Sequence, residues 1–242
     1  MHISGSGHIS GGEYHEDCSV SGSAKINGDL RCIRFSCSGS ANGVGNLTCE
    51  EGVKVSGSLH IRRSVHAKMI HASGSFHVDG DCTGSEEIKT SGAFHCGGNV
   101  KTTVLHIAGA LSAEGGIEAE EAYISGKIVT AGLLNAEKVV LRLEGAPSHI
   151  NAIGGSEITI QKNPYKTNMS RLPFLGKFFS STGELRVSEA IEGDVISLEN
   201  TTVPLVVGRI VTIGPGCKIV RVQYSEELHL DPVAEVGTSE KI

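Results

Sequence analysis

Three histidines recur at nearly equal steps along the first half of the chain. His60, His77 and His95 follow one another at steps of seventeen and eighteen positions, and His8 holds the corresponding place near the N-terminus. Imidazole is a frequent ligand of Zn²⁺, so histidines stacked on neighbouring strands could share a metal. However, the neighbouring outward positions hold mixed residue types, and no Asp or Glu stands in a fixed relation to the series. We therefore expect a solvated histidine ladder, with no metal site and no cofactor.

Other residues that could support catalysis do not form a recognisable site. The acidic pairs Glu50-Glu51, Glu86-Glu87 and Glu120-Glu121 all fall at one corner of the repeat described below, where they are solvated turn residues. No glycine-rich turn precedes a helix that carries Lys-Ser or Lys-Thr, as a phosphate-binding loop requires. An acyltransferase of the hexapeptide type would need a catalytic histidine, for which only His106 or His149 is available. We expect a protein that is not an enzyme and has no catalytic residue.

These side chains are positioned by a short internal repeat. A small residue followed by glycine recurs at every seventeenth or eighteenth position. The pairs are Ser21-Gly22, Ser38-Gly39, Ser56-Gly57, Ser73-Gly74, Ser91-Gly92, Ala108-Gly109 and Ser125-Gly126. A period this short and this steady is typical of a solenoid, in which each repeat contacts only its neighbours.

Within each repeat, apolar or small residues form three pairs. The members of a pair lie two positions apart, and successive pairs lie six positions apart. Around Ser21 the pairs are Cys18 with Val20, Ala24 with Ile26, and Leu30 with Cys32. A spacing of two is the strand period, so each pair forms the inward face of one short strand. The sequence therefore predicts an all-β fold, a single-stranded parallel β-helix (β-solenoid) of triangular section, whose coils are about 4.8 Å apart.

The corners between these strands absorb the variation in repeat length. Glycine recurs at the second corner, for example at Gly28 and Gly45, because a tight turn needs backbone angles closed to other residues. The two longer repeats carry their extra residue at the third corner, in Glu50-Glu51-Gly52 and Ser85-Glu86-Glu87. We expect the turn to absorb this residue, so that the inward register is preserved.

The sequence divides into four segments. Regular coils occupy 1–161, and an inserted loop occupies 162–183. The β-rich pattern resumes over 184–233, where Ile196, Ile213 and Leu230 lie seventeen positions apart, so we expect one long solenoid that continues past the loop. The last segment, 234–242, is a short polar tail that we expect to be mobile.

The segment 162–183 combines two prolines with large apolar and basic side chains. Its candidate binding residues are Arg171, Leu172, Phe174, Leu175, Lys177, Phe178 and Phe179. This mixture is typical of a segment that binds a membrane surface or a partner protein, although it is far too short to span a bilayer. The alternative is that the segment folds back over an apolar face or an end of the solenoid.

Composition restricts the partners and the compartment. Aromatic residues make up 4% of the chain and tryptophan is absent, as expected for a thin solenoid filled by small aliphatic side chains. The net charge of −6, with no basic run, argues against nucleic acid as a partner. Most of the seven cysteines occupy inward positions, so we expect buried, reduced thiols. No basic stretch followed by an apolar run opens the sequence, so we expect a cytoplasmic protein without a secretory signal.

The two ends of the predicted solenoid are candidate self-assembly sites. Terminal coils expose unpaired N–H and C=O groups, and proteins normally cover such edges with a helix, a charge or a proline. Met1, Ile3 and Ile9 lead directly into an imperfect first coil, and Leu228 and Leu230 lie in the last one. We expect these residues to pair with a second copy of the chain.

The repeat resembles that of the bactofilins, polymer-forming cytoskeletal proteins of bacteria. The resemblance is carried by motifs such as Val-Ser-Gly-Ser-Leu-His-Ile at 55–61 and Ala-Ser-Gly-Ser-Phe-His-Val at 72–78, and it covers about residues 18–141. The stretch 194–217 is similar to the C-terminal part of longer members from Firmicutes. The resemblance implies a right-handed helix, nucleotide-independent assembly into filaments, other bactofilin-like subunits as partners, and association with the inner face of the cell membrane.

The chain departs from this family in two ways, and three functional hypotheses follow. It shows no short apolar N-terminal segment of the kind that tethers many members to a membrane, and it has more coils than the compact family core. The first hypothesis is a cytoplasmic scaffold that self-associates end to end, with the inner membrane surface as a further partner. The second is a non-polymerising adaptor that docks a partner or a membrane through 162–183. The third is a hexapeptide-type acyltransferase.

Overall fold

The computed structural model describes residues 1–162 and 183–242, which contain strands and turns but no helix. The chain forms two compact units, Met1–Glu120 (unit 1) and Glu121–Ile242 (unit 2). All strand pairs with a defined register are parallel, and the strands form the coils of a β-solenoid, as predicted. The handedness of the coil stays a prediction.

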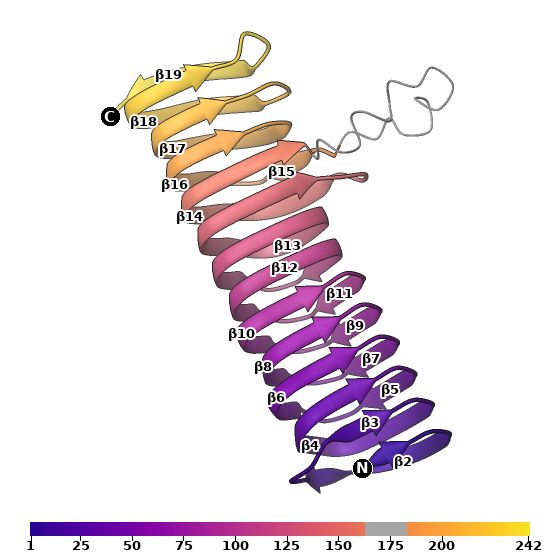
Figure 1. Cartoon of the computed structure of the whole chain (residues 1–242). Helices are drawn as coiled ribbons and strands as arrows, with labels where there is room; N and C mark the ends of the chain where they lie inside the picture. The colour runs from indigo at the N-terminus through magenta and orange to yellow at the C-terminus, as the bar shows by residue number, and fades with distance from the viewer. Residues whose placement is uncertain (163–182) are drawn as a thin grey trace, which may run out of the picture. The chain divides into compact units, whose positions relative to one another are not determined.

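Unit 1 contains strands β1 to β12 and the beginning of β13. Their bounds are β1 His2–Ile3, β2 Ser6–Glu13, β3 Cys18–Val20, β4 Ser23–Cys37, β5 Ser40–Gly43, β6 Leu47–Val55, β7 Ser58–Ile61, β8 Val65–Ala72, β9 Ser75–Val78, β10 Cys82–Thr90, β11 Ala93–Cys96, β12 Val100–Ala113 and β13 Ile117–Leu143. Strands β4, β6, β8 and β10 stack in one column, and β5, β7, β9 and β11 in another (Figure 1). Long strands such as β4 run through a corner of the coil, because they exceed one side of the triangle.

The inward pairs predicted from the sequence form the core of unit 1. Leu30 lies beside Leu47, which lies beside Val65, and all three side chains are at most 1% exposed. Phe76 and Phe94 stack with their ring centroids 5.1 Å apart and their planes inclined by 14°. Each coil thus buries its apolar side chains against the equivalent residues of the next coil, and this contact is the main source of stability in a solenoid.

The corners confirm the predicted register and add a second reason for glycine. The register of β6 on β8 shifts between Thr48 and Gly52 and pairing resumes at Gly52, so the extra residue of this longer repeat lies at the third corner, as predicted. At the Ser-Gly corner, a Cβ on Gly57 would collide with the carbonyl oxygen of Gly39 in the preceding coil. Close approach between stacked backbones, rather than an unusual φ angle, therefore excludes larger residues there.

A column of polar side chains, the corner ladder, supports the second corner. It consists of Asp29, Asn46, Ser64, Asp81 and Asn99. Each side chain accepts a hydrogen bond from a backbone N–H of the next coil: Asn46 N–H donates to Asp29 Oδ1 at 2.7 Å, and Asn99 N–H donates to Asp81 Oδ1 at 2.7 Å. The ladder satisfies backbone donors at a turn that has no strand partner for them.

Unit 2 contains the rest of β13 and strands β14 to β19. Their bounds are β14 Ser148–Lys162, β15 Leu185–Val187, β16 Ala190–Leu198, β17 Thr201–Ile213, β18 Lys218–Leu230 and β19 Glu235–Lys241. The residue pairs Ser148 with Leu185 and Ile158 with Ile196 show that the coil pattern resumes after the insertion. The candidate loop residues between Arg171 and Phe179 lie outside the described residues.

The expected coil length is wrong in one part of unit 2. Ile213 pairs with Leu230 as predicted, but Ile196 pairs with Val211 and not with Ile213, so this coil is two positions shorter than expected. The coil is shorter because each of two corners contains one residue fewer than the corresponding corner of unit 1. At the first of them, Leu198 and Thr201 are both buried and the turn between them contains Asn200, whose φ is 47°.

The segment 234–242, for which the sequence predicts a mobile polar tail, contains a strand. Residues Glu235–Lys241 form β19, whose backbone pairs with Lys218–Tyr224 of β18. The polar side chains of this segment do not prevent pairing, because a parallel strand is held to its neighbour by backbone hydrogen bonds.

Candidate functional site

The histidine ladder forms as the repeat predicts. Strand β9 pairs with β7 and β11, and this register places His77 between His60 and His95. The ring centroids of His60 and His77 are 4.4 Å apart, and those of His77 and His95 are 4.3 Å apart. All three side chains point outward and are partly exposed, because their neighbours in each strand fill the inward positions.

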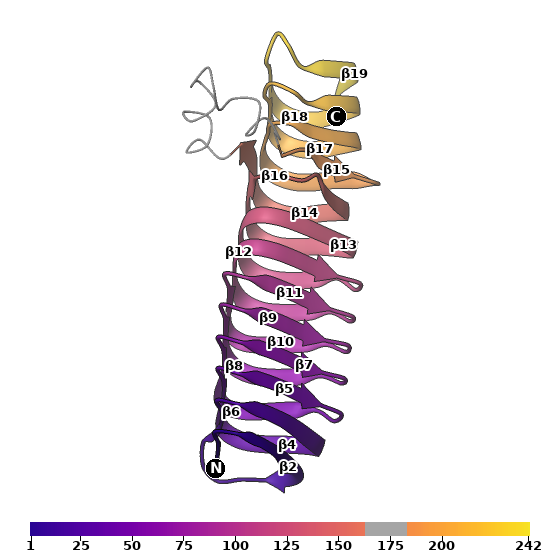
Figure 2. The same cartoon turned by 90° about the vertical axis from the view of Figure 1, so that its right-hand side faces the viewer.

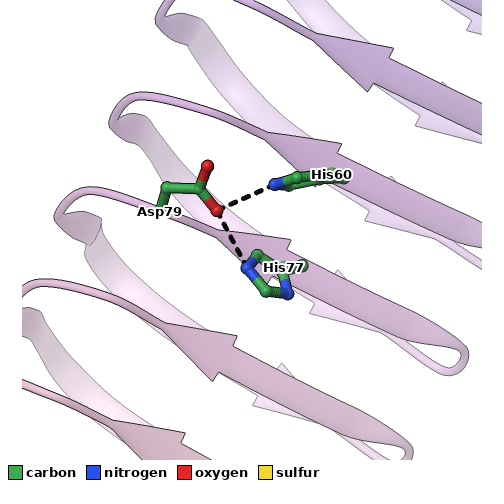
Figure 3. Close-up of side chains that lie close together, drawn as sticks. All are labelled: His60, His77 and Asp79. Carbon is green, nitrogen blue, oxygen red and sulfur yellow. Dashed lines mark hydrogen bonds and ion pairs between the residues drawn. The ribbon is translucent and has the colours of Figure 1, made fainter.

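A carboxylate joins two of these histidines. Asp79 Oδ1 lies 2.8 Å from His60 Nε2 and 2.9 Å from His77 Nε2 (Figure 3). No acidic residue recurs in a fixed relation to the ladder, as the sequence indicates, but Asp79 contacts two of its histidines. His77 lies in β9, and Asp79 directly follows the last residue of this strand, Val78. Because the two residues are two positions apart, the strand period places their side chains on the same face. That spacing was visible in the sequence, but only one coil carries it, since Arg62 and Gly97 occupy the equivalent places after His60 and His95.

The three groups change one another's protonation. Partial burial lowers the pKa of His77, and the neighbouring charges of His95 and His60 lower it further, while Asp79 opposes the shift. The hydrogen bond from His60 holds the pKa of the Asp79 carboxyl below its usual range. The arrangement thus favours neutral His77 beside an ionised carboxylate, and the donor atoms of His60, His77 and Asp79 all lie within 4.8 Å of one another.

The two alternative candidates for the catalytic histidine of an acyltransferase belong to different units. His106 lies on β12 of unit 1, whereas His149 lies on β14 of unit 2. His149 Nε2 is 3.1 Å from the hydroxyl oxygen of Ser188 on an exposed surface. Of the acidic corner pairs, Glu87 contacts His71 at 2.7 Å and Glu51 forms an ion pair with Arg34. These contacts are separate surface pairs.

All seven cysteines are free and buried, as the inward pattern predicts. Cys32 and Cys49 lie in the same column of neighbouring coils, with their sulfur atoms 3.6 Å apart. Burial raises the pKa of Cys18 to about 11 and that of Cys96 to about 11. Cys18 and Cys96 therefore stay protonated near neutral pH, and all seven side chains act as small apolar fillers.

The N-terminal candidate residues surround the first coil of unit 1. Strand β1 pairs with β3, and β2 pairs with β4. Among the residues that the structure describes, no strand pairs with the other edge of β1 or β2. The N-terminus lies beside β2 (Figure 2). Met1 and Ile3 are half-buried, but Ile9 is 0% exposed, so the first coil presents the Ile9 backbone and not its side chain at the edge.

The C-terminal candidate residues lie on the part of β18 that β19 does not cover. Strand β19 covers β18 only from Lys218 to Tyr224. Leu228 and Leu230 continue the inward column of Val211 and Ile213, yet no strand in the described part of the chain covers their other edge. Leu230 is consequently 47% exposed, whereas Ile213 beneath it is 0% exposed.

Comparison with known proteins gives relatives but no family. Residues of this chain are 33% identical over 111 positions to uncharacterized protein YhbF and 36% identical over 112 positions to uncharacterized protein YhbE, both of Bacillus subtilis strain 168. Each alignment covers 46% of this chain and 42% or 44% of the relative, so the chain spans less than half the length of these relatives. No family model and no solved structure matches. The described residues include no helix with the length and apolar character needed to cross a membrane.

Proposed function

We propose that this chain is a structural subunit that assembles end to end into a nucleotide-independent scaffold. The observation that carries the proposal is the exposed apolar column at Leu228 and Leu230 of β18, which no described strand covers. An exposed backbone edge beside an apolar column is a template for another strand. The occupant that fits it best is a coil with the same parallel pairing and the same inward spacing, namely that of a second copy.

The first coil of unit 1 offers a complementary edge. The backbone of β2 is bare on one side among the described residues, and Ile3 is only half-buried. A second chain stacked there would extend the column that runs through Ile9 and Ile26, which pair in register. Contact between unlike ends of two chains is a head-to-tail interface, and such an interface generates an open filament when the rotation does not close.

The resemblance to bactofilins supports the same proposal and adds to it. It favours filaments in the cytoplasm, other bactofilin-like subunits as partners, and association with the inner membrane surface, for which the apolar and basic residues of 162–183 are the candidates in this chain. An adaptor that does not polymerise remains the alternative, and it differs from the scaffold in the size of the purified particle.

The proposal is tested by charging the two ends. Leu230→Lys and Ile3→Lys place a cation on each open edge at sites where the side chain has access to solvent, so the coils should stay folded. We expect filaments of the wild type in negative-stain microscopy, and discrete particles of the double variant with unchanged circular dichroism. Met69→Lys is the matched control, because Met69 is a 42% exposed apolar residue on the side of the solenoid. Discrete wild-type particles would contradict the scaffold and favour the adaptor.

A further inference from the structure

We propose that His60, His77 and Asp79 form a binding site for one divalent transition-metal ion of the zinc class. Two imidazole nitrogens and one carboxylate oxygen are a ligand set that Zn²⁺ accepts. The three donor atoms belong to two neighbouring coils and lie within 4.8 Å of one another. This site is independent of assembly, because it lies on the side of unit 1 and includes no residue of either end.

The distances suit a shared ion. Zinc binds nitrogen and oxygen at about 2.0–2.2 Å, so two ligand atoms of one tetrahedral ion lie roughly 3–4 Å apart. Asp79 Oδ1 is 2.8 Å from His60 Nε2 and 2.9 Å from His77 Nε2 (Figure 3). The carboxylate oxygen therefore needs to move away from each nitrogen by only several tenths of an ångström, which side-chain rotation at a partly exposed site permits.

The protons can be accommodated without charging the rings. Both histidines direct Nε2 at the same carboxylate oxygen, which accepts hydrogen bonds from both rings when they are neutral and protonated at Nε2. A metal ion takes the place of the two bridging protons, and each neutral ring then carries its proton on Nδ1. In the metal-free structure the Asp79 carboxylate contacts both rings, and in the metal-bound state it becomes the third ligand and supplies negative charge to the cation.

The fold fixes the two histidines before any ion binds. His60 and His77 are directly paired residues of β7 and β9, and buried residues flank each of them, Leu59 with Ile61 and Phe76 with Val78. Their Cα positions are therefore set by the backbone ladder, and an ion would gain two preorganised ligands. A pair of histidines on separate loops would have to be ordered at the time of binding.

The fourth position is open to solvent. His95 lies next to His77, with a ring-centroid distance of 4.3 Å, but its nitrogens are not among the converging atoms. Three protein ligands and one open position differ from the closed, four-ligand arrangement of structural zinc sites. An ion held in this way would link two coils and leave one coordination position for water.

The inference can be tested by titrating the untagged full-length chain with Zn²⁺ in a calorimeter. We expect one ion per chain, and we expect His77→Asn and Asp79→Asn each to weaken binding roughly tenfold or more, because even partners outside the ligand shell commonly contribute that much. Both residues are on the surface, and circular dichroism checks that the variants fold. His71→Asn is the matched control, because His71 pairs with Glu87 at 2.7 Å on the same unit without a second histidine.

A second measurement separates this site from the thiols. Co²⁺ bound to nitrogen and oxygen should give visible ligand-field bands without thiolate charge transfer, and His77→Asn should remove them. Zinc binding that is equal in the wild type, His77→Asn and Asp79→Asn would overturn the proposal. Thiolate bands would overturn it as well, because they would place the ion at cysteines.

Discussion

The two units use the same inward pattern but differ in how strictly they keep its length. In unit 1 successive coils differ by one position at most, and equivalent side chains lie directly above one another, as in the Phe76 and Phe94 stack. In unit 2 the coil between Ile196 and Val211 is two positions shorter than the one that follows it. A parallel coil tolerates such a change only at its corners, one of which contains Asn200 with a left-handed φ of 47°.

Constant coil length has a consequence for polar residues. Unit 1 carries the corner ladder and the histidine ladder, both of which need the same residue position in successive coils. The core of unit 2 consists mainly of branched aliphatic side chains such as Ile158, Ile196 and Val211. Apolar contacts survive a shift in register because they are not directional, whereas hydrogen bonds do not.

The largest effect should come from a charge inside the regular unit. Phe76→Asp places an unpaired carboxylate between Leu59 and Phe94, and it should cost about 3–5 kcal/mol and unfold the middle of unit 1. Ser75→Asp is the control, because Ser75 is the exposed neighbour on the same strand. Thermal melting by circular dichroism measures both. Equal losses of stability at the two positions would mean that the inward and outward assignments are incorrect.

An intermediate effect should come from alkaline pH, and it should fall mainly on unit 1. Six of the seven buried thiols lie there, and only Cys217 lies in unit 2. Burial raises the pKa of Cys18 and Cys96 from 9.0 to about 11. The folded chain therefore holds these protons when the unfolded chain has lost them, so stability is complete below pH 9 and decreases as the pH rises toward 11.

This dependence is measured by urea unfolding at several pH values. Cys18 and Cys96 should each account for a loss of roughly 2–3 kcal/mol by the upper end of that range. Cys18→Val with Cys96→Val should flatten the pH dependence, because two of the titrating groups are gone. Cys217→Val is the control for unit 2 and should change the slope less. A slope that is unaffected by the double substitution would show that other groups cause the alkaline loss.

The sequence predicted unit 1 better than unit 2, and the reason is physical. The small-Gly pairs and the inward spacing of two define each strand of unit 1, because every coil repeats the same steric requirement. Past Val139 the regular recurrence of small-Gly pairs is lost in unit 2, so the pairing of Ile196 with Val211 depends on how tightly two corners close. Strand β19 was missed because its pairing with β18 consists of backbone hydrogen bonds that its polar sequence does not reveal.

The candidate site was predictable in part. The spacing of His60, His77 and His95 predicted the ladder, because stacked coils convert sequence period into proximity. The contribution of Asp79 was missed because it occurs once, and a search for repeated positions overlooks a residue that belongs to one coil. The corner ladder was also missed, since it alternates Asp, Asn and Ser, which share hydrogen-bonding capacity but not identity.

The smallest effect should come from removing one step of the corner ladder. Asn46 donates its backbone and side-chain N–H groups to Asp29 Oδ1 at 2.7 and 3.1 Å, and its own Oδ1 accepts the Ser64 backbone N–H at 3.1 Å. Asn46→Ala keeps the backbone bond to Asp29 but removes the acceptor for Ser64. The partly buried donor then depends on water, so we expect a loss of about 1 kcal/mol in the free energy of unfolding.

Asn42→Ala is the control for this substitution, because Asn42 is an exposed asparagine on β5 in the same coil. Hydrogen exchange should show faster exchange of the Ser64 amide in Asn46→Ala and no change in Asn42→Ala. If the Ser64 amide stays equally protected in both variants, the ladder follows from the regular coil and does not stabilise it. Constant coil length in unit 1 would then depend on the glycine corners alone, where Gly57 packs against the Gly39 backbone without space for a side chain.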